Sequence, residues 1–227
     1  MEGEYLEMRT IEDTYLRAIF EGSYLKGGIA NKQLSELLKV TPASTTEFTQ
    51  KLRERGLVRG RKYGKVSLSE KGQQKAQQIM QKFRLCEVLL EKHFDLSLSE
   101  VVQQAWLLAD FSSEILLQEL NDKLGKPEKT FFGAEVQKPE IFNSDLDLLS
   151  NIKTGKAVIL REYYGSENMI HYFSELNLAL NTNLTVEKYD HDFNVFMLLT
   201  AKGKRIMVSK EMANFIYVEP QQGKTSS

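Results

Sequence analysis

The stretch VTPASTTEFTQKLRERG, residues 40–56, decides how the first third of this chain folds. Thr41 is suited to cap a helix whose first position is Pro42, where a missing N–H costs nothing. Gly56 is suited to end that helix after about Arg55. We therefore expect a helix over residues 42–55 that begins directly after a tight turn.

Two helices are expected before this stretch. Thr10-Ile11-Glu12-Asp13 resembles a capping box, which predicts a helix from there to about Gly22. Asn31 is suited to cap a second helix that ends at Lys39 and carries three leucines on one face.

A β-hairpin is expected after the stretch. Residues 57–60 and 66–68 flank Arg61-Lys62-Tyr63-Gly64-Lys65, which would form a basic tip. Helix, helix, tight turn, helix and basic hairpin is the order of a winged helix-turn-helix. We assign residues 1–72 to such a domain.

The next segment is helical. We expect a long helix over residues 70–94, a helix opened by the capping box Ser97-Leu98-Ser99-Glu100, and another over residues 112–124. These helices carry more apolar side chains than a lone helical hairpin can bury, which indicates self-association. Residues 73–126 are therefore expected to form a helical dimerisation domain.

The last third changes to β structure. Residues 127–152 hold glycine and proline with few periodic residues and are expected to be a linker. A helix at about 166–176 interrupts short β-rich runs, which are residues 157–164, 184–189, 195–199, 205–208 and 216–219. Five short strands in this length suit a small β-barrel, assigned to residues 153–220, so the fold class is α+β.

Composition limits the class of protein. The lone Cys86 cannot form an internal disulfide, no apolar run is long enough to span a bilayer, and the N-terminus lacks the features of a signal peptide. We expect a cytoplasmic protein. No phosphate-binding glycine loop, nucleophile elbow or paired Cys or His motif is present, so we do not expect an enzyme.

Charge is concentrated in one segment. The whole chain has a net charge of -1, yet residues 51–75 hold nine basic and two acidic residues, a net charge of +7. A segment of this charge can bind phosphate, whereas the remainder would repel a polyanion. Double-stranded DNA is the expected partner.

The candidate DNA contacts lie on the third helix and the hairpin. Residues at the start of a recognition helix lie near base edges, and basic groups nearby hold phosphates. Small hydroxyls, an alanine that can touch a thymine methyl group and a glutamate that can accept from cytosine N4 make a reading surface. The candidates are Thr41, Ala43, Ser44, Thr46, Glu47, Gln50, Lys51, Arg61, Lys62 and Lys65.

Several motifs resemble the diphtheria-toxin-repressor and manganese-repressor family of metal-dependent transcription regulators. Residues 15–21, YLRAIFE, resemble its first helix, residues 40–47 its recognition helix, and residues 82–87, KFRLCE, its K-H-R-L-x-E segment except at one position. Residues 157–219 resemble the FeoA-type barrel of its longer members. The resemblance implies a homodimeric repressor that binds a palindromic operator when manganese or iron is bound.

The metal ligands of that family do not carry over. The segment VVQQAWLLAD, residues 101–110, falls where the family has H-x-E-A-[CE]-x-x-E-H. Only Glu87 stands where the family has a carboxylate, and Asp110 takes the place of a histidine. The positions that match family ligands are Thr14, Phe83, Glu87, Val102, Trp106, Ala109 and Asp110.

We therefore expect no metal cofactor, because a transition-metal site needs several N, S or O donors that converge. The apolar residues at these positions could lock the DNA-binding form or hold a cavity for an organic effector. His171 in the predicted barrel remains a weak candidate for an ancillary metal. Two alternatives stay open: metal response through a non-standard site, and an adaptor that binds protein instead of DNA.

Overall fold

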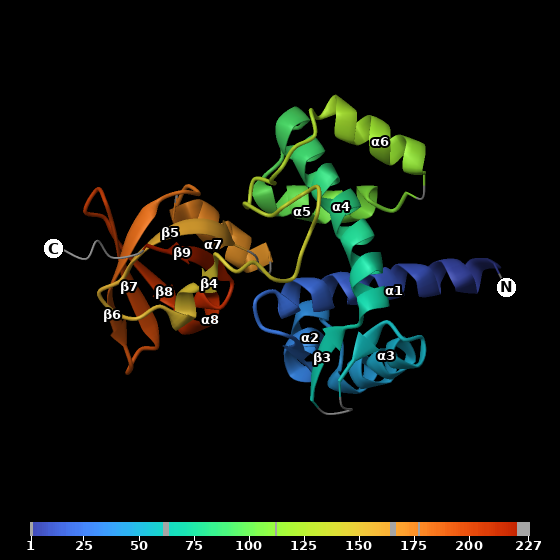
Figure 1. Ribbon diagram of the computed structural model, residues 1–227, viewed down its shortest axis with the longest axis horizontal. Coiled ribbons are helices and arrows are strands. Elements are labelled where there is room, and N and C mark those ends of the chain that lie inside the picture. The colour runs from blue at the N-terminus through green and yellow to red at the C-terminus, as the bar shows by residue number, and fades with distance from the viewer. Residues whose placement is uncertain (1, 61–63, 112, 164–166, 177, 222–227) are drawn as a thin grey trace. The chain divides into compact units, whose positions relative to one another are not determined.

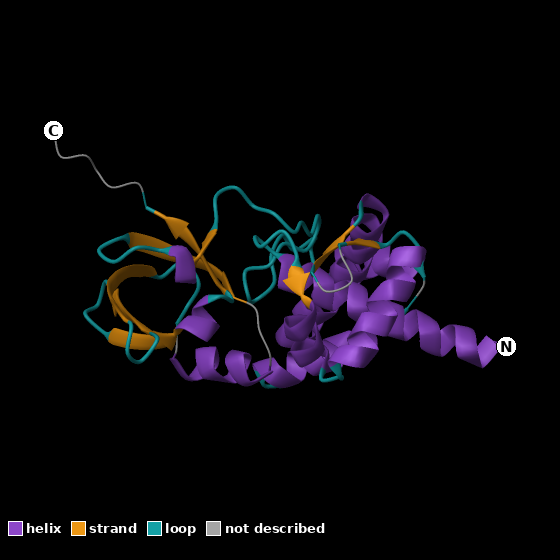
Figure 2. Ribbon diagram, turned by 90° about the horizontal axis from the view of Figure 1, so that it is seen from below, coloured by secondary structure: helices purple, strands orange, loops and turns teal. Residues whose placement is uncertain are grey.

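The computed structural model describes residues 2–60, 64–111, 113–163, 167–176 and 178–221. The chain divides into two compact units. Unit 1 comprises Met1–Asp95, Gln103–Thr130 and Glu135–Phe142, and unit 2 comprises Leu96–Val102, Phe131–Ala134 and Asn143–Ser227. Unit 1 is mostly helical, whereas unit 2 is built on curved strands (Figure 2).

Unit 1 begins with the expected winged helix-turn-helix. Its elements are α1 (Glu2–Ser23), β1 (Ile29–Ala30), α2 (Asn31–Leu38), α3 (Pro42–Glu54), β2 (Val58–Arg59) and β3 (Lys65–Leu68). The three short strands form an antiparallel sheet in the order β1-β3-β2. In Figure 1, α2, α3 and β3 gather beside α1 at one end of the unit.

Two helix starts differ from the prediction. The first helix begins at Glu2 instead of Thr10, because most residues before the supposed capping box are good helix formers. The N-cap of α2 is Ala30, and Asn31 is the first helical residue. The Asn31 side chain instead donates to the Pro42 carbonyl (3.2 Å) and the Thr46 hydroxyl (2.9 Å), which joins the starts of α2 and α3.

The start of α3 is as expected. Thr41 is the N-cap, and its hydroxyl accepts from the Ser44 N–H at 3.1 Å. Gly56 follows the helix with a φ of +72°, in the left-handed region that favours glycine.

The helical segment contains α4 (Glu70–His93), α5 (Leu98–Leu108) and α6 (Glu114–Lys123). Ser69 caps α4 through a bond from the Gly72 N–H, 3.0 Å long. In unit 1, α4 packs against α1, and the buried side chains Leu16, Ile19 and Phe20 of α1 and Met80 and Phe83 of α4 contribute to its core.

Unit 2 contains one six-stranded antiparallel sheet in the order β4-β9-β5-β6-β7-β8. Its strands are β4 (Asp147–Leu148), β5 (Ala157–Tyr163), β6 (Asn183–Asp190), β7 (Val195–Thr200), β8 (Arg205–Ser209) and β9 (Ile216–Pro220). Between them lie the 3-10 helix η1 (Leu149–Asn151), α7 (Glu167–Leu176) and α8 (Lys210–Ala213). No pairing joins the edge strands β4 and β8 in the part of the chain that is described, so the sheet is curved without being a closed barrel.

The expected linker is more structured than its composition indicates. It contains β4, which pairs with β9, and an isolated bridge between Lys129 and Glu135. Phe132 is buried in the core of unit 2 beside Tyr163, with ring centroids 5.5 Å apart.

Among the described helices, none is both long and apolar enough to cross a membrane.

Candidate nucleic-acid interface and regulatory junction

The N-terminal turn of α3 is open to solvent. Thr41, Ala43, Ser44 and Glu47 are exposed. Thr45 and Thr49, one helical turn apart, are buried against the domain. The helix thus presents small polar side chains on one face while the other face fixes it in place.

Further along α3, the candidate contacts make bonds within the helix. The Glu47 carboxylate lies 2.8 Å from the Lys51 ammonium, and the Gln50 amide donates to Glu54 at 2.9 Å. Lys51 holds the pKa of Glu47 below its usual value, chiefly through their hydrogen bond. Thr46 is half-buried and bonded to Asn31, so it is less available than the first-turn residues.

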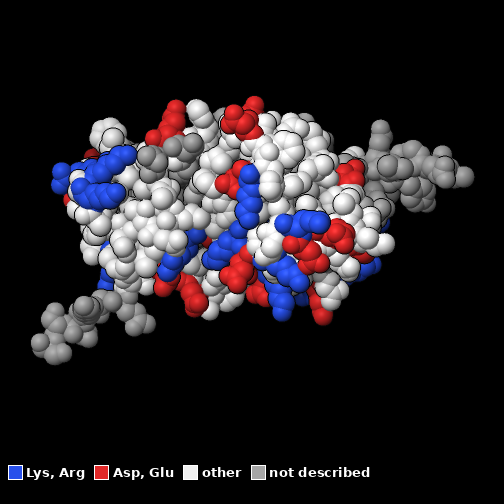
Figure 3. Space-filling view, turned by 90° about the horizontal axis from the view of Figure 1, so that it is seen from above, with Lys and Arg blue, Asp and Glu red and all other residues white. Residues whose placement is uncertain are grey.

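The wing supplies Lys65, which is exposed at the start of β3. Arg61 and Lys62 lie outside the described residues. Figure 3 shows basic side chains gathered at its left edge and basic and acidic side chains mixed farther right, between broad uncharged areas.

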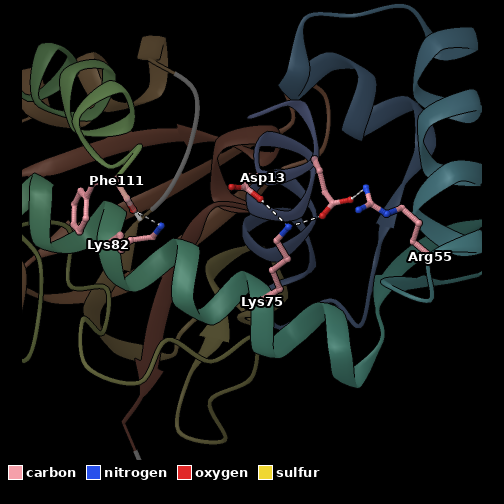
Figure 4. Close-up of polar contacts among 6 residues, drawn as sticks. Asp13, Arg55, Lys75, Lys82 and Phe111 are labelled. Atoms are coloured by element: carbon pink, nitrogen blue, oxygen red, sulfur yellow. Dashed lines mark hydrogen bonds and ion pairs between the residues drawn. The ribbon is translucent and has the colours of Figure 1, made fainter. Parts of the chain in front are cut away.

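A buried carboxylate ties α1 to the end of α3. Glu12 is 2% exposed and pairs with Arg55, the C-cap of α3, and with Lys75 of α4. Lys75 also lies 3.2 Å from Asp13, so one ammonium serves two neighbouring carboxylates. Figure 4 shows Arg55, Lys75 and Asp13 converging between these helices.

An arginine occupies the junction of α1, α4 and α5. The Arg17 guanidinium carbon lies 3.9 Å from the centroid of the Phe83 ring and 4.6 Å from that of Trp106. The two rings meet edge to face at a centroid distance of 5.8 Å. Arg17 also donates to Glu21 at 3.2 Å. The aromatic faces and the carboxylate together stabilise the guanidinium.

Beside this junction lies Glu87, which is 6% exposed. Burial raises its pKa to about 8, although the charges of Arg17 and Arg84 act in the opposite direction. Burial likewise raises the pKa of the neighbouring Cys86 thiol to about 12. Both groups therefore favour the protonated form at neutral pH in this arrangement.

The positions that match family ligands do not form a metal site. Phe83 and Trp106 pack edge to face and offer no metal-binding donor, Ala109 is buried, and Thr14 is half-buried on α1. Asp110 is exposed, and Val102 lies in the segment that belongs to unit 2. Within the described ranges, no three His, Cys, Asp or Glu side chains come close enough together to hold a metal ion.

His171, the candidate in unit 2, is exposed on α7. Its Nε2 lies 3.3 Å from a Glu175 oxygen one turn along the same helix. This is one histidine and one carboxylate at helical spacing, which is too small a ligand set for a specific site.

Sequence reasoning missed Arg17, Glu12 and Lys75. Each looks like an ordinary charged helix residue, and their partners lie far away in the sequence. The only signal was that Arg17 lies one helical turn after Thr14, which places both on the same side of α1.

Three family models match consecutive parts of the chain. Residues 8–66 match the N-terminal DNA-binding domain of iron-dependent repressors, residues 69–137 match their metal-binding and dimerisation domain, and residues 148–220 match the FeoA domain. No curated protein sequence matches the chain.

Solved structures share the fold over almost the full length. A metal-dependent transcriptional regulator, MtsR, is 22% identical with a TM-score of 0.81 and covers 92% of this chain and 98% of its own. A manganese-dependent transcriptional repressor in complex with manganese is 22% identical with a TM-score of 0.77, covering 92% and 100%. ScaR with bound zinc is 24% identical with a TM-score of 0.75, covering 92% and 98%.

The expectation of no metal cofactor is wrong. Residues 69–137 match a domain defined by metal binding, and structural neighbours include manganese-bound and zinc-bound proteins, so the family implies a metal cofactor. The side chains at the seven positions that match family ligands do not form a site that fits a manganese, iron or zinc ion.

Proposed function

The chain belongs to the family of iron-dependent repressors that includes the diphtheria-toxin and manganese repressors, and from this membership we propose that it represses transcription by binding an inverted-repeat operator as a homodimer. Members of this family are transcriptional regulators and not enzymes. The observation that carries the proposal is the exposed first turn of α3, capped by Thr41 and followed by the wing.

The proposed reading surface uses the first turn of α3. Ala43 and Ser44 are exposed and short enough to let the helix enter the major groove, where Glu47 can accept from cytosine N4. Lys51 in the last turn of α3 and Lys65 at the start of β3 are exposed and would bind phosphates, together with Arg61 and Lys62. Thr46 and Gln50 belong to the same proposed surface, where Thr46 is bonded to Asn31 and Gln50 to Glu54 in the absence of DNA.

A homodimer would place two such helices about one turn of DNA apart. Support comes from exposed apolar side chains on α5 and α6, where Leu107 is 69% and Ile115 76% exposed, with Leu108 and Leu116 beside them. Apolar side chains gathered at this density suit an interface between two copies.

We retain the domain division at residues 1–72, 73–126, 127–152 and 153–220 and the cytoplasmic location as parts of the proposal. The DNA contact itself requires no step through the metal, because its groups lie on α3 and the wing.

The test is selection of operator sequences from random DNA by the full-length protein, followed by affinity measurements. The selected sites should form an inverted repeat, and the logarithm of affinity should fall steeply with the logarithm of salt concentration. Replacing Lys51 or Lys65 by Gln should weaken binding to all sequences and lower the salt slope by about 1 each. Failure to enrich any sequence, or a flat salt response, would contradict the proposal and favour a protein-binding adaptor.

Metal response is measured in the same assay, with chelator compared against added manganese, iron(II) or zinc. A rise in operator affinity with one ion would identify the cofactor that the family implies. Replacing Glu87 by Gln and Asp110 by Asn in that assay would then show whether either side chain takes part.

A further inference from the structure

A cavity of about 100 Å³ opens beside Trp106 in unit 1. It is about two-thirds of the roughly 150 Å³ that accommodates benzene in an engineered protein cavity, so a compound smaller than benzene fits inside and a longer one extends out of the opening. Its lining consists of four apolar side chains, Ile79, Trp106, Leu107 and Ala109, and three charged ones, Asp13, Lys82 and Asp110.

The two aspartates among the lining residues favour a cation that can donate hydrogen bonds. Lys82 already donates to the Phe111 carbonyl at 2.9 Å, as Figure 4 shows. Asp13 Oδ1 is buried and pairs with the Lys75 ammonium at 3.2 Å, whereas 24% of the Asp13 side chain is exposed. Asp110 forms no hydrogen bond or ion pair with any described residue. Two carboxylates, each able to accept further hydrogen bonds, therefore line the cavity together with the Lys82 ammonium, which is already engaged.

We propose that this cavity binds a small primary ammonium compound with an apolar body, and that the bound compound alters operator affinity. The ammonium group would donate to Asp13 and Asp110 while its hydrocarbon lies against Trp106 and Ile79. A bare divalent cation suits the cavity less well, because only two carboxylates line it and such an ion prefers about six or more oxygen ligands.

A series of ion pairs connects the cavity to the C-terminal end of α3. A ligand ammonium that binds Asp13 competes with Lys75 for that carboxylate, and Lys75 also holds Glu12. Glu12 in turn holds Arg55 at the C-cap of α3. A ligand in the cavity thus changes the ion pairs at the C-terminal end of α3, the helix that is proposed to read DNA. The regulatory part of the inference therefore rests on the proposed function.

Trp106 allows a direct test, because it is the only tryptophan in the chain and lines the cavity. The full-length protein without DNA is titrated with isoamylamine, with the neutral isoamyl alcohol, and with manganese, while tryptophan fluorescence is recorded. We expect a saturable change with the amine alone. Asp13→Asn and Asp110→Asn should each weaken it by about tenfold or more, whereas Asp122→Asn on α6 should leave it unchanged.

Asp13→Asn also removes an ion pair with Lys75 and could lower stability. Asp110 is exposed, so weaker binding by Asp110→Asn would not be explained by misfolding. No saturable change at millimolar amine, an equal response to the alcohol, or a manganese response lost in both variants would each overturn the proposal.

The regulatory part is tested by operator affinity with and without saturating amine, where a change of about fivefold or more is expected. Unchanged affinity with the cavity occupied would overturn it. The fluorescence titration contains no DNA and the operator assay is first run without amine, so failure of the DNA-binding proposal is distinguishable from failure of this one.

Discussion

Glu87 is a carboxyl group enclosed on α4 beside two arginines. Its pKa of about 8 lies above the ordinary value of 4.5 because burial disfavours the charged form. The folded protein therefore holds a proton on Glu87 over a pH range in which the unfolded chain has released it.

This raised pKa predicts how stability depends on pH. Between pH 4.5 and 8 the folded state binds more protons at Glu87 than the unfolded state, so this group makes the free energy of unfolding fall as pH rises through that window. Glu87→Gln cannot ionise. Its stability relative to the parent chain should rise across the same window, by on the order of a few kcal/mol in total.

Urea unfolding at a series of pH values measures the difference between the two proteins. Glu91→Gln, at an exposed position one turn later on α4, is the matched control and should track the parent chain at every pH. Parallel curves for Glu87→Gln and the parent chain would contradict a buried, protonated Glu87.

At the scale of the element, the stability of α3 depends on the cap at its first turn. Thr41 is the side chain that satisfies an otherwise unpaired N–H at the start of the helix. Thr41→Ala should lower the free energy of unfolding by about 1 kcal/mol, and Thr41→Ser should restore it. Both are measured by chemical denaturation, and an unchanged midpoint for the alanine variant would show that the cap contributes nothing.

The start of α4 is held by close contact with the chain before the wing. A Cβ atom placed on Gly72 would lie 1.9 Å from the Leu57 carbonyl oxygen, a backbone atom that cannot move aside easily. Gly72→Ala should therefore lower the free energy of unfolding by about 1 to 3 kcal/mol, despite the better helix propensity of alanine.

Gln74→Ala, at an exposed site on the same helix, isolates the clash from the propensity effect and should be neutral or slightly stabilising. A more stable Gly72→Ala variant would mean that α4 starts farther from Leu57 than the structure places it.

At the scale of the molecule, association should depend on the apolar side chains of α5 and α6. Ile115→Asp places a charge on the most exposed of them without disturbing a buried contact. We expect sedimentation to show more monomer and operator affinity to fall, while thermal stability of the monomer is unaffected. Gln78→Asp on α4 adds the same charge elsewhere, and an equal loss of association in that variant would rule out a specific interface.

Local sequence signals predicted the architecture well. Thr41, Pro42 and Gly56 act through neighbours a few residues away, so the start and end of α3 could be read directly. The strand β4 was missed because its pairing partner, β9, lies about 70 residues later and a two-residue strand has no periodicity of its own. The FeoA domain was expected from the resemblance of residues 157–219, although the described strands do not close into a barrel.

The junction of α1, α4 and α5 was only partly predictable. The lack of metal ligands at Phe83 and Trp106 could be read from the chain, but the inference that no metal acts on the protein did not follow from it. The positions of Arg17 and Lys75 between distant helices depend on tertiary packing, which no short pattern reports.

The division of the chain into two units determines where it could be shortened. Unit 2 consists of Leu96–Val102, Phe131–Ala134 and Asn143–Ser227, so its residues are drawn from three separate stretches of the gene product. A stop codon after Phe142 would remove the sheet but leave Phe132, which is 5% exposed, without the side chains that cover it. Unit 2, unlike the continuous stretch 148–220 that matches the FeoA domain, is therefore not bounded by a single joint, and this chain cut after Phe142 would need compensating changes near residues 96–102 and 131–134.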